Sequence, residues 1–336
     1  MSKILVTGGC GYIGSHTLVD LIDNGFEVVS IDNLINASES ILDGVKAITG
    51  KTVQNYAVDL CDKAATKAVF QAHPDIAGII HFAALKYVGE SVEQPLRYFR
   101  NNLDSLLNIL ECMLEFRVKN IIFSSSCSVY GNATELPVTE STPFQNAESP
   151  YARTKQMGEH ILQDFCFQEK NTNAVILRYF NPAGAHESTL MGEAATAATN
   201  LVPVITETAA GKRASMTVFG ADYPTRDGSC VRDYIHVMDL ANAHTKAIQY
   251  LLANRQESNC ETFNLGIGEG VTVLEAIKAF EEVAGQKLNY IIGPRRAGDV
   301  VAIYANNNRA TERLGWLAQR SITDIMRTAW AWEQKR

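Results

Sequence analysis

The chain has 336 residues, 46% of them hydrophobic and 20% charged, a composition typical of a globular protein with one large domain or two medium ones. Its formal net charge of −7 argues against a nucleic-acid-binding protein, whose binding surface would be basic. No apolar run approaches the roughly 18 residues of a membrane span, and we expect no signal peptide before the first apolar run at Ile4.

The seven cysteines are scattered along the chain and form no Cys-x-x-Cys pair. This pattern favours reduced thiols in a cytoplasmic protein over disulfides. No group of histidines, cysteines and carboxylates has the spacing of metal ligands, so we expect no metal. His81 and His236 are accordingly expected to be structural.

The N-terminal segment has the order of a dinucleotide-binding unit. An apolar run at 4–6 predicts a buried strand, Gly8, Gly11 and Gly14 predict a tight turn, and a helical pattern then leads to a second apolar run at 27–31. Glycines at these places would let a pyrophosphate approach the backbone at the start of the helix. The alternative is a plain turn between two buried elements.

The second predicted strand ends in Asp32. A carboxylate at this place can accept hydrogen bonds from both hydroxyls of an adenosine ribose, and it would repel a 2'-phosphate. The sequence therefore predicts NAD rather than NADP, unless Asp32 is an ordinary acidic turn residue.

The alternation of strands and helices continues to about residue 180. Further strands are predicted at 53–57, 78–82, 120–123 and 174–178, and helices at 62–72, 94–116 and 151–170. This pattern predicts an α/β fold with a doubly wound parallel (Rossmann) sheet, in which ligands bind beyond the carboxyl ends of the strands. Residues at such ends are Gly8, Asp32, Asp59, Ala83, Ser124, Ser125, Ser126 and Asn181.

From about residue 181 the pattern becomes irregular, which predicts a smaller mixed α/β substrate domain. Its expected elements are helices at 201–210, 237–252 and 272–284 and strands at 217–219 and 261–265, and the tryptophans of the tail are expected to pack. We therefore expect a cofactor domain at 1–180 and a substrate domain at 181–336, with residues 232–255 packing against the first domain.

Tyr151 and Lys155 lie four residues apart on a predicted helix and therefore share one face. A nearby ammonium lowers the pKa of a phenol from its ordinary value near 10. The pair can then act as a general base near neutral pH, provided that a substrate hydroxyl reaches it. The spacing alone is common on helices, so this interpretation depends on the rest of the chain.

A series of motifs, in the same order, resembles the extended short-chain dehydrogenase/reductase family and, within it, the branch of UDP-galactose 4-epimerases. The motifs cover nearly the whole chain and are 6–16 (VTGGCGYIGSH), 31–34 (IDNL), 81–91 (HFAALKYVGES), 124–131 (SSSCSVYG), 150–155 (PYARTK), 178–185 (RYFNPAGA) and 231–240 (VRDYIHVMDL). The resemblance implies a tightly held NAD that is regenerated in each cycle, and interconversion of UDP-galactose and UDP-glucose.

The resemblance also implies roles for single residues. Tyr151 would take the proton of the sugar 4'-hydroxyl, Ser126 would bind the 4'-oxygen, and Lys155 would bind the nicotinamide ribose. The 4-keto sugar would then turn over before the hydride returns to its other face. The cofactor residues carried over by motif are Gly8, Gly11, Tyr12, Ile13, Gly14, Asp32, Asn33, Asp59, Leu60, Phe82, Ala83, Ala84, Lys86, Asn101, Ser124, Tyr151, Lys155 and Tyr179.

The UDP-sugar would be held mainly by the second domain. By resemblance its contacts are Ser126, Tyr151, Asn181, Asn200, Leu201, Thr217, Phe219, Arg232, Arg296, Asp299 and Ile303. The two arginines can neutralise a pyrophosphate, although surface ion pairs are the alternative. For Asn200 and Leu201 the alternative is ordinary loop packing.

Two departures from related enzymes narrow the function. Cys127 and Ser128 stand where nucleotide-sugar 4,6-dehydratases keep an Asp-Glu pair, so a dehydratase is not expected. At the position of Ile303 the family ranges from tyrosine, which narrows the hexose pocket, to small residues, which admit an N-acetyl group. Isoleucine is intermediate in size. We therefore expect activity on UDP-glucose and UDP-galactose with some activity on the N-acetyl sugars.

Three other functions stay open: a UDP-N-acetylglucosamine or dual-specificity 4-epimerase, a UDP-glucuronate 4-epimerase, and a non-catalytic NAD-sensing regulator. The regulator is disfavoured because such proteins can dispense with the base, and Ser126, Tyr151 and Lys155 are all present. The resemblance further implies a homodimer formed through the predicted helices 94–116 and 151–170.

Overall fold

The computed structural model describes residues 1–194, 198–296 and 300–336, and its central feature is a seven-stranded sheet. The strands follow the order β11-β6-β5-β4-β1-β2-β3, and every pair is parallel. Their bounds are β1 Lys3–Thr7, β2 Glu27–Ile31, β3 Gln54–Tyr56, β4 Ile76–His81, β5 Asn120–Ser126, β6 Asn173–Tyr179 and β11 Cys260–Leu265. The predicted doubly wound parallel sheet is confirmed, and its strand order reverses between β1 and β4.

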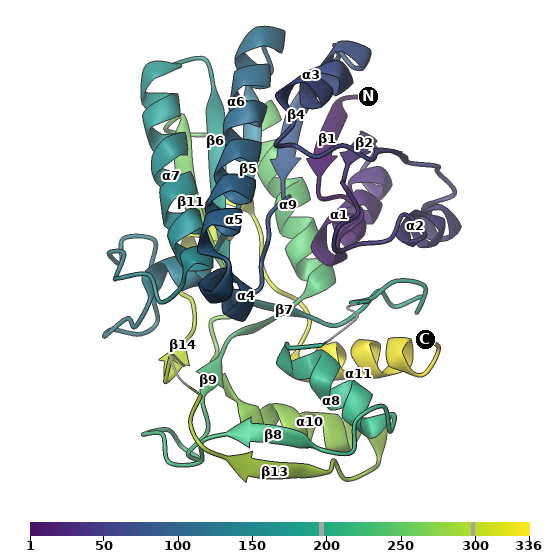
Figure 1. Ribbon diagram of the computed structural model, residues 1–336, viewed down its shortest axis with the longest axis vertical. Coiled ribbons are helices and arrows are strands. Elements are labelled where there is room, and N and C mark those ends of the chain that lie inside the picture. Colours follow the sequence, from purple (N-terminus) through teal and green to yellow (C-terminus); the bar gives the residue numbers. More distant parts are fainter. Residues whose placement is uncertain (195–197, 297–299) are drawn as a thin grey trace.

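Helices cover both faces of this sheet (Figure 1). One layer holds α1 (Tyr12–Asp23), α2 (Ile41–Thr49) and α9 (Val237–Leu252); the other holds α3 (Lys63–Ala72), α6 (Ser105–Phe116) and α7 (Pro150–Gln168). Ile4 and Val6 pack into the first layer and Leu5 into the second, because side chains alternate along a strand. Both faces are therefore apolar, which explains the continuous hydrophobic runs in the sequence.

The helix predicted over 94–116 is confirmed in its extent, but it is not uniform: it consists of α5 (Pro95–Phe99), a π-helical turn (Arg100–Asp104) and α6, which follow one another without a break. A separate short helix, α4 (Val88–Glu93), precedes it. Pro95 starts a new helix because it has no N–H to continue the previous one. Asn102 in the π-helical turn donates to Leu85 O (3.0 Å) and Thr154 Oγ1 (3.1 Å), which ties the end of β4 to α7.

The remaining strands form small sheets at the other end of the molecule (Figure 1). They pair as β10-β7, β12-β9-β14 and β13-β8. The elements are β7 Asn181–Ala183, α8 Leu201–Ala209, β8 Met216–Phe219, β9 Val231–Arg232, β10 Tyr234–His236, β12 Val271–Thr272, α10 Val273–Ala284, β13 Tyr290–Gly293, β14 Ala302–Ile303 and α11 Ile322–Glu333. A 3₁₀ turn (Cys127–Tyr130) follows β5, and a π-helical turn (Ala310–Leu314) precedes the tail.

A second core lies between α8, α10 and α11. Thr272 caps α10 in a capping box with Glu275, at the start of the helix predicted over 272–284. In the tail, Trp316 is fully buried and donates to Asp239 O (2.9 Å), and the Trp330 ring lies 5.5 Å from that of Phe280. The tryptophans therefore pack as expected, although the sequence did not predict α11.

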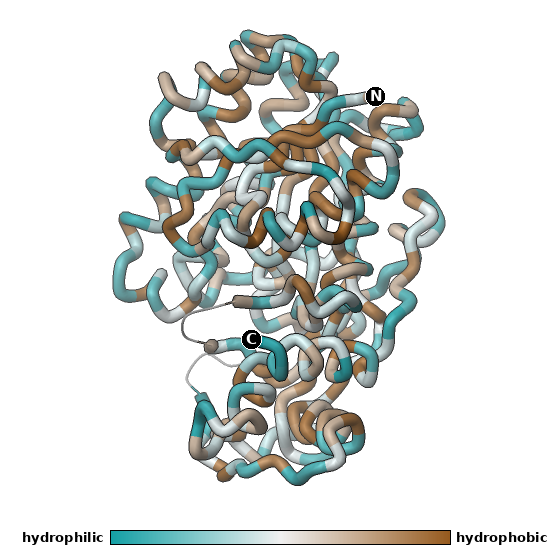
Figure 2. Tube along the Cα trace, turned by 90° about the vertical axis from the view of Figure 1, so that its right-hand side faces the viewer, coloured by the Kyte–Doolittle hydropathy of each residue, from teal (hydrophilic) through white to brown (hydrophobic). Residues whose placement is uncertain are grey.

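The chain crosses between the two ends more than once. α9 packs on α1 and on β4, β5 and β6, and β11 pairs with β6 at the edge of the large sheet. In Figure 2 the hydrophobic stretches run through the interior and hydrophilic stretches follow the outer loops. Within the described ranges, every helix is too short or too polar to span a lipid bilayer.

Candidate active site

The glycines of the turn after β1 let neighbouring backbone segments pack closely. Gly8 has a φ of +71°, and a Cβ there would lie 3.0 Å from Ala83 N, at the end of β4. A Cβ on Gly14 would lie 2.1 Å from Gly8 O. α1 begins directly after Gly11, and its first N–H groups receive no side-chain cap. This cradle of N–H groups at a helix start fits the pyrophosphate of a dinucleotide.

Asp32 lies beside this turn at the end of β2. One carboxylate oxygen accepts from Cys10 N (3.1 Å) and the other from Leu34 N (2.9 Å). Burial raises the pKa of Asp32, and the backbone N–H groups act in the opposite direction. A carboxylate next to the glycine turn fits the ribose of NAD and disfavours a 2'-phosphate. The residues present therefore fit the cofactor that the sequence predicts.

The catalytic candidates come from two neighbouring elements. Ser126 ends β5, while Tyr151 and Lys155 lie on the first turns of α7, which Ser149 caps through Ala152 N (3.2 Å). The Ser126 hydroxyl is near enough to the Tyr151 phenol to act on its pKa. The Lys155 Nζ lies 5.9 Å from the centre of the Tyr151 ring. The structure thus brings together the three residues that the sequence singled out.

The predicted lowering of the Tyr151 pKa is wrong for this structure. Burial raises the pKa of Tyr151 to about 12, although the Ser126 hydroxyl acts in the other direction. Lys155 donates to Ser124 O (2.6 Å) and lies over the Phe123 ring, so its charge is not directed at the phenol oxygen. Burial also lowers the pKa of Lys155 to about 8.

Two pairs of buried polar side chains lie near the catalytic candidates. Ser124 and Tyr179 share a hydrogen bond through their hydroxyls, and His81 Nδ1 lies 2.9 Å from Thr7 Oγ1. Burial, together with the charge of Lys155, lowers the pKa of His81 to about 3, so this imidazole is neutral. No metal-binding cluster occurs in the part of the chain that the structure describes.

Other predicted cofactor residues surround the carboxyl ends of β1 to β4. Tyr12 donates to Gly184 O (2.6 Å), and the Phe82 ring lies 4.5 Å from that of His244. Asp59 Oδ1 accepts from Cys61 N, and Asn33 Oδ1 accepts from Ile35 N. Leu60 is buried, and Asn101 donates to Asn102. Ile13 packs against the core at the start of α1, and Ala84 belongs to the loop after β4. These residues stay predictions, since no contact to a ligand tests them.

The predicted substrate residues are spread over the second end of the molecule. Arg232 pairs with Ile303 between β9 and β14, and its guanidinium donates to Val300 O (2.7 Å). Ile303 is 5% exposed and packs in a cluster with Cys127, next to Ser126. The other candidates lie on β7 (Asn181), at the start of α8 (Asn200, Leu201), on β8 (Thr217, Phe219) and after β13 (Arg296). Asp299 lies outside the described residues.

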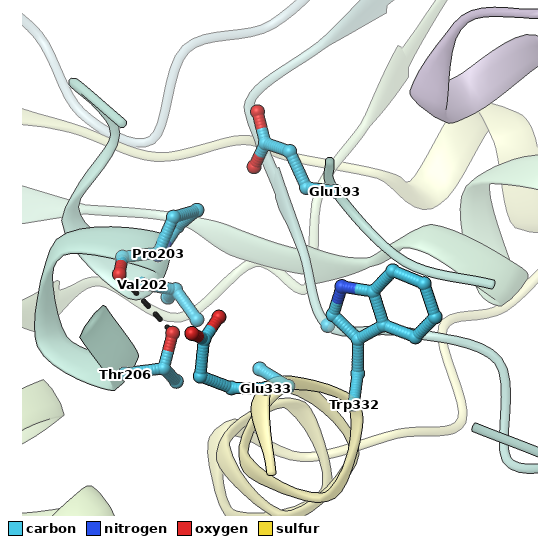
Figure 3. Close-up of a pocket in the computed structure, with 8 residues that line it drawn as sticks. Glu193, Val202, Pro203, Thr206, Trp332 and Glu333 are labelled. Atoms are coloured by element: carbon cyan, nitrogen blue, oxygen red, sulfur yellow. Dashed lines mark hydrogen bonds between the residues drawn. The ribbon is translucent and has the colours of Figure 1, made fainter. Parts of the chain in front are cut away.

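Two acidic residues near the site were missed by the sequence analysis. Asp233 is fully buried and accepts from the N–H groups of Ile267, Gly268 and Ala305, which fixes the backbone beside Arg232. Asp233 could have been found from the 231–240 motif, in which the sequence analysis gave a role only to Arg232. Glu193 belongs to an irregular segment without periodicity and lines a pocket of ≈ 280 Å³ with Thr206, Trp332 and Glu333 (Figure 3).

A parallel sheet with a glycine turn after one strand and a Ser–Tyr–Lys group after another defines the class of short-chain dehydrogenases/reductases. Comparison with known proteins agrees. The family model described as GDP-mannose 4,6 dehydratase matches residues 5–329. The chain therefore belongs to this family of extended short-chain dehydrogenases/reductases.

Relatives within the family are more specific. A UDP-glucose 4-epimerase of Yersinia pestis is 46% identical over 333 residues, which is 99% of this chain and 97% of that protein. The UDP-glucose 4-epimerase of Bifidobacterium longum, solved with NAD+ and UDP, is 44% identical with a TM-score of 0.94, covering 99% and 98% of the two chains. The UDP-Glc/GlcNAc 4-epimerase of Campylobacter jejuni is 36% identical with a TM-score of 0.85 over 100% of both chains.

Proposed function

We propose that this protein is a UDP-glucose 4-epimerase, an NAD-dependent isomerase that interconverts UDP-galactose and UDP-glucose through a 4-keto sugar. The observation that carries the proposal is the contact of Ser126 and Tyr151, with Lys155 5.9 Å from the phenol ring, in a chain that matches epimerases over its full length. Bound NAD supplies the hydride acceptor at sugar C4 and the hydride donor to the opposite face of the ketone.

The proton is moved by residues of this chain. Tyr151 takes it from the sugar 4'-hydroxyl, and the neighbouring hydroxyl of Ser126 bridges the sugar oxygen and the phenol. Because burial raises the pKa of Tyr151 to about 12, this residue needs more positive charge nearby to act as a base at neutral pH. Lys155, which donates to Ser124 O, does not supply that charge in this structure, whereas the positive ring of the oxidised cofactor would.

The second end of the molecule is proposed to hold the UDP. Asn181 has a buried Oδ1 without a partner among the described residues, so it can still accept a hydrogen bond. Phe219 is 45% exposed on β8, where an aromatic face can stack on uracil. We propose that residues 1–180, with the returning α9 and β11, form the cofactor part and that the rest of 181–336 forms the UDP-sugar part.

A dehydratase is disfavoured by the pair Cys127–Ser128. Removing water across C5 and C6 needs an acid and a base, and burial raises the pKa of the Cys127 thiol to about 12. A dual-specificity epimerase is the second candidate, because Ile303 leaves more room than a tyrosine and the Campylobacter jejuni relative bears the name UDP-Glc/GlcNAc 4-epimerase.

We also propose that the protein is a cytoplasmic homodimer. All seven cysteines are free thiols, as in reducing compartments. Exposed apolar side chains gather on α4 to α7, at Val88, Val92, Leu96, Leu107, Leu114 and Met157. Leu107 and Leu114 are two turns apart on one face of α6, which suits a helix-to-helix interface. A monomeric mass in solution would contradict this assembly.

The function is tested by incubating the purified protein with UDP-galactose, adding no cofactor, and following UDP-glucose by NMR. We expect both sugars to reach the same ratio from either direction, because the cofactor is regenerated in each cycle. The proposal would be contradicted if one NAD were consumed for each product formed, or if no conversion occurred in the presence of NAD.

A further inference from the structure

Glu193 joins a residue of the cofactor side to a residue of the substrate side. Its Oε1 accepts a hydrogen bond from Asn200 Nδ2 (3.0 Å) and lies 3.7 Å from Lys86 Nζ. Lys86 follows β4 at the end of the large sheet, and Asn200 directly precedes α8. One carboxylate oxygen therefore links two side chains that lie far apart in the sequence.

The backbone that leads into Glu193 is fixed by packing. Met191 is fully buried in the core cluster that contains α1 and α9. A Cβ on Gly192 would lie 2.5 Å from Cδ1 of Trp332, so the indole of α11 lies directly against this segment. The carboxylate is therefore placed by both ends of the molecule, and Figure 3 shows it on the side of the pocket opposite Glu333.

Burial of the Glu193 carboxylate costs folding free energy, so a role in binding would explain its presence. Its side chain is 9% exposed, and its Oε2 has no hydrogen-bond partner within the described ranges. Its charge also acts on Tyr12, whose pKa is raised first by burial and then by Glu193. A buried charge with an unsatisfied oxygen opposes folding. Removing it should therefore stabilise the chain, or at least cost little, if it only packed.

We propose that Glu193 is a positioning residue that couples the retention of NAD to the binding of UDP. This inference rests on the proposed function, in which Lys86 contacts the cofactor and Asn200 the nucleotide. Lys86 is 47% exposed, so its long side chain loses freedom when the cofactor is bound. A ligand that orders Asn200 also orders Glu193 and Lys86, so the second ligand loses less entropy. Each ligand then strengthens the binding of the other.

The test compares the release of NAD from the full-length, NAD-loaded protein with and without saturating UDP. In the natural protein we expect UDP to slow NAD release about tenfold, within the usual range of coupling between two sites. Glu193→Ala should reduce this ratio to within about twofold. Glu193→Gln keeps an oxygen for Asn200 but loses the charge for Lys86, and its ratio should be intermediate.

Glu187→Gln is the matched control. Glu187 belongs to the same segment, is 57% exposed and lies 3.5 Å from Arg320, away from Lys86 and Asn200. This variant should keep the ratio of the natural protein. The measured quantity is the ratio of the NAD release rates without and with UDP. A variant that only destabilises the fold lowers the melting temperature and speeds NAD release equally in both conditions, so it leaves this ratio unchanged.

Two results would overturn the inference alone: a Glu193→Ala protein whose UDP effect equals that of the natural protein, or a natural protein that binds both ligands with no effect of UDP on NAD release. If the natural protein binds neither NAD nor UDP, the proposed function itself fails and the inference with it. These outcomes are separated by measuring bound NAD and UDP affinity in the natural protein first.

Discussion

The two ends of this molecule are held together by different means. The cofactor end is one seven-stranded sheet whose strands pair along their length, with apolar helices on both faces. The substrate end has strands of two to four residues in separate small sheets, and single side chains such as Asp233 connect them. Long runs of backbone pairing therefore dominate at the first end, whereas the second end combines short strands with a helical core and individual side-chain bonds.

This difference suits the two tasks of a 4-epimerase. A cofactor that must meet the sugar at one fixed place requires a rigid frame, which the parallel sheet provides. A 4-keto sugar that presents both faces requires a hold on the nucleotide and freedom at the hexose. We therefore expect substitutions at the first end to change chemistry or stability strongly, and substitutions at the second end to change affinity or specificity.

The largest effect is expected from Tyr151→Phe. Because this change removes the general base, turnover should fall by about 10²–10⁴-fold, while NAD and UDP stay bound. Phe219→Ala at the other end should instead raise KM with little change in kcat, since it removes only a contact with the nucleotide. Steady-state kinetics and bound NAD measure both variants, and a Phe219→Ala protein that loses kcat as strongly as Tyr151→Phe would break the comparison.

The second prediction concerns stability. Glu159 of α7 pairs with Arg178 of β6 (2.6 Å), both side chains are at most 5% exposed, and Ser125 also donates to Glu159. Breaking such a buried pair should cost about 3–5 kcal/mol of unfolding free energy, so we expect this loss in Glu159→Gln. The pair holds the helix of Tyr151 against the sheet, and turnover should fall with stability.

Glu275→Gln is the matched change at the substrate end. Glu275 pairs with Arg226, the side chains are 43% and 50% exposed, and a glutamine preserves the capping box with Thr272. The cost should be at most about 1 kcal/mol. Equal losses in the two variants, measured by chemical denaturation, would show that the two ends are equally dependent on their charge pairs.

The first end was largely predictable from the sequence, because buried parallel strands are continuous apolar runs and the helices between them are amphipathic. The extent of the helix over 94–116 followed from its apolar spacing, but the π-helical turn at Arg100–Asp104 inside it did not. β11 was identified as a strand, yet its place beside β6 was not, since spacing within one segment does not reveal a distant partner. The amphipathic tail helix α11 was overlooked.

The candidate site was also predictable only in part. Ser126, Tyr151 and Lys155 follow from motif positions, and the structure places them together. The direction of the Tyr151 pKa does not follow from spacing, because it depends on burial and on the bond between Lys155 and Ser124. Glu193 could not be found either, since its partners lie on other segments and its own segment has no periodic pattern.

The third prediction is a pH dependence of the cofactor end. His81 has a pKa of about 3 in the folded protein because it is buried beside Lys155, whereas an unfolded histidine titrates near 6.5. The unfolded chain therefore binds more protons as the pH falls below 6.5, and stability is lost on acidification. The stability gap between the natural protein and His81→Asn should narrow by about 2–3 kcal/mol from pH 7 to pH 4.5. A gap independent of pH would contradict the neutral buried imidazole.

The smallest effect is expected at Ile303, where the substrate end meets the catalytic group. Ile303→Ala should raise the rate with UDP-N-acetyl sugars relative to UDP-hexoses about tenfold, and Ile303→Tyr should lower this ratio by a similar factor. Kinetics with both substrate pairs measure it, and in the natural protein the hexose rate should be the higher one. An N-acetyl rate at least equal to the hexose rate would overturn that ordering.

Val138→Ala is the control for Ile303, because Val138 is fully buried in the same cluster. It should reduce stability, as a cavity does, without changing the ratio of the two substrate rates. If Val138→Ala changes this ratio as much as Ile303→Ala, sugar choice reflects the packing of the whole cluster rather than one side chain at the pocket. The substrate end would then resemble the cofactor end, with specificity set by a rigid core rather than by a single adjustable contact.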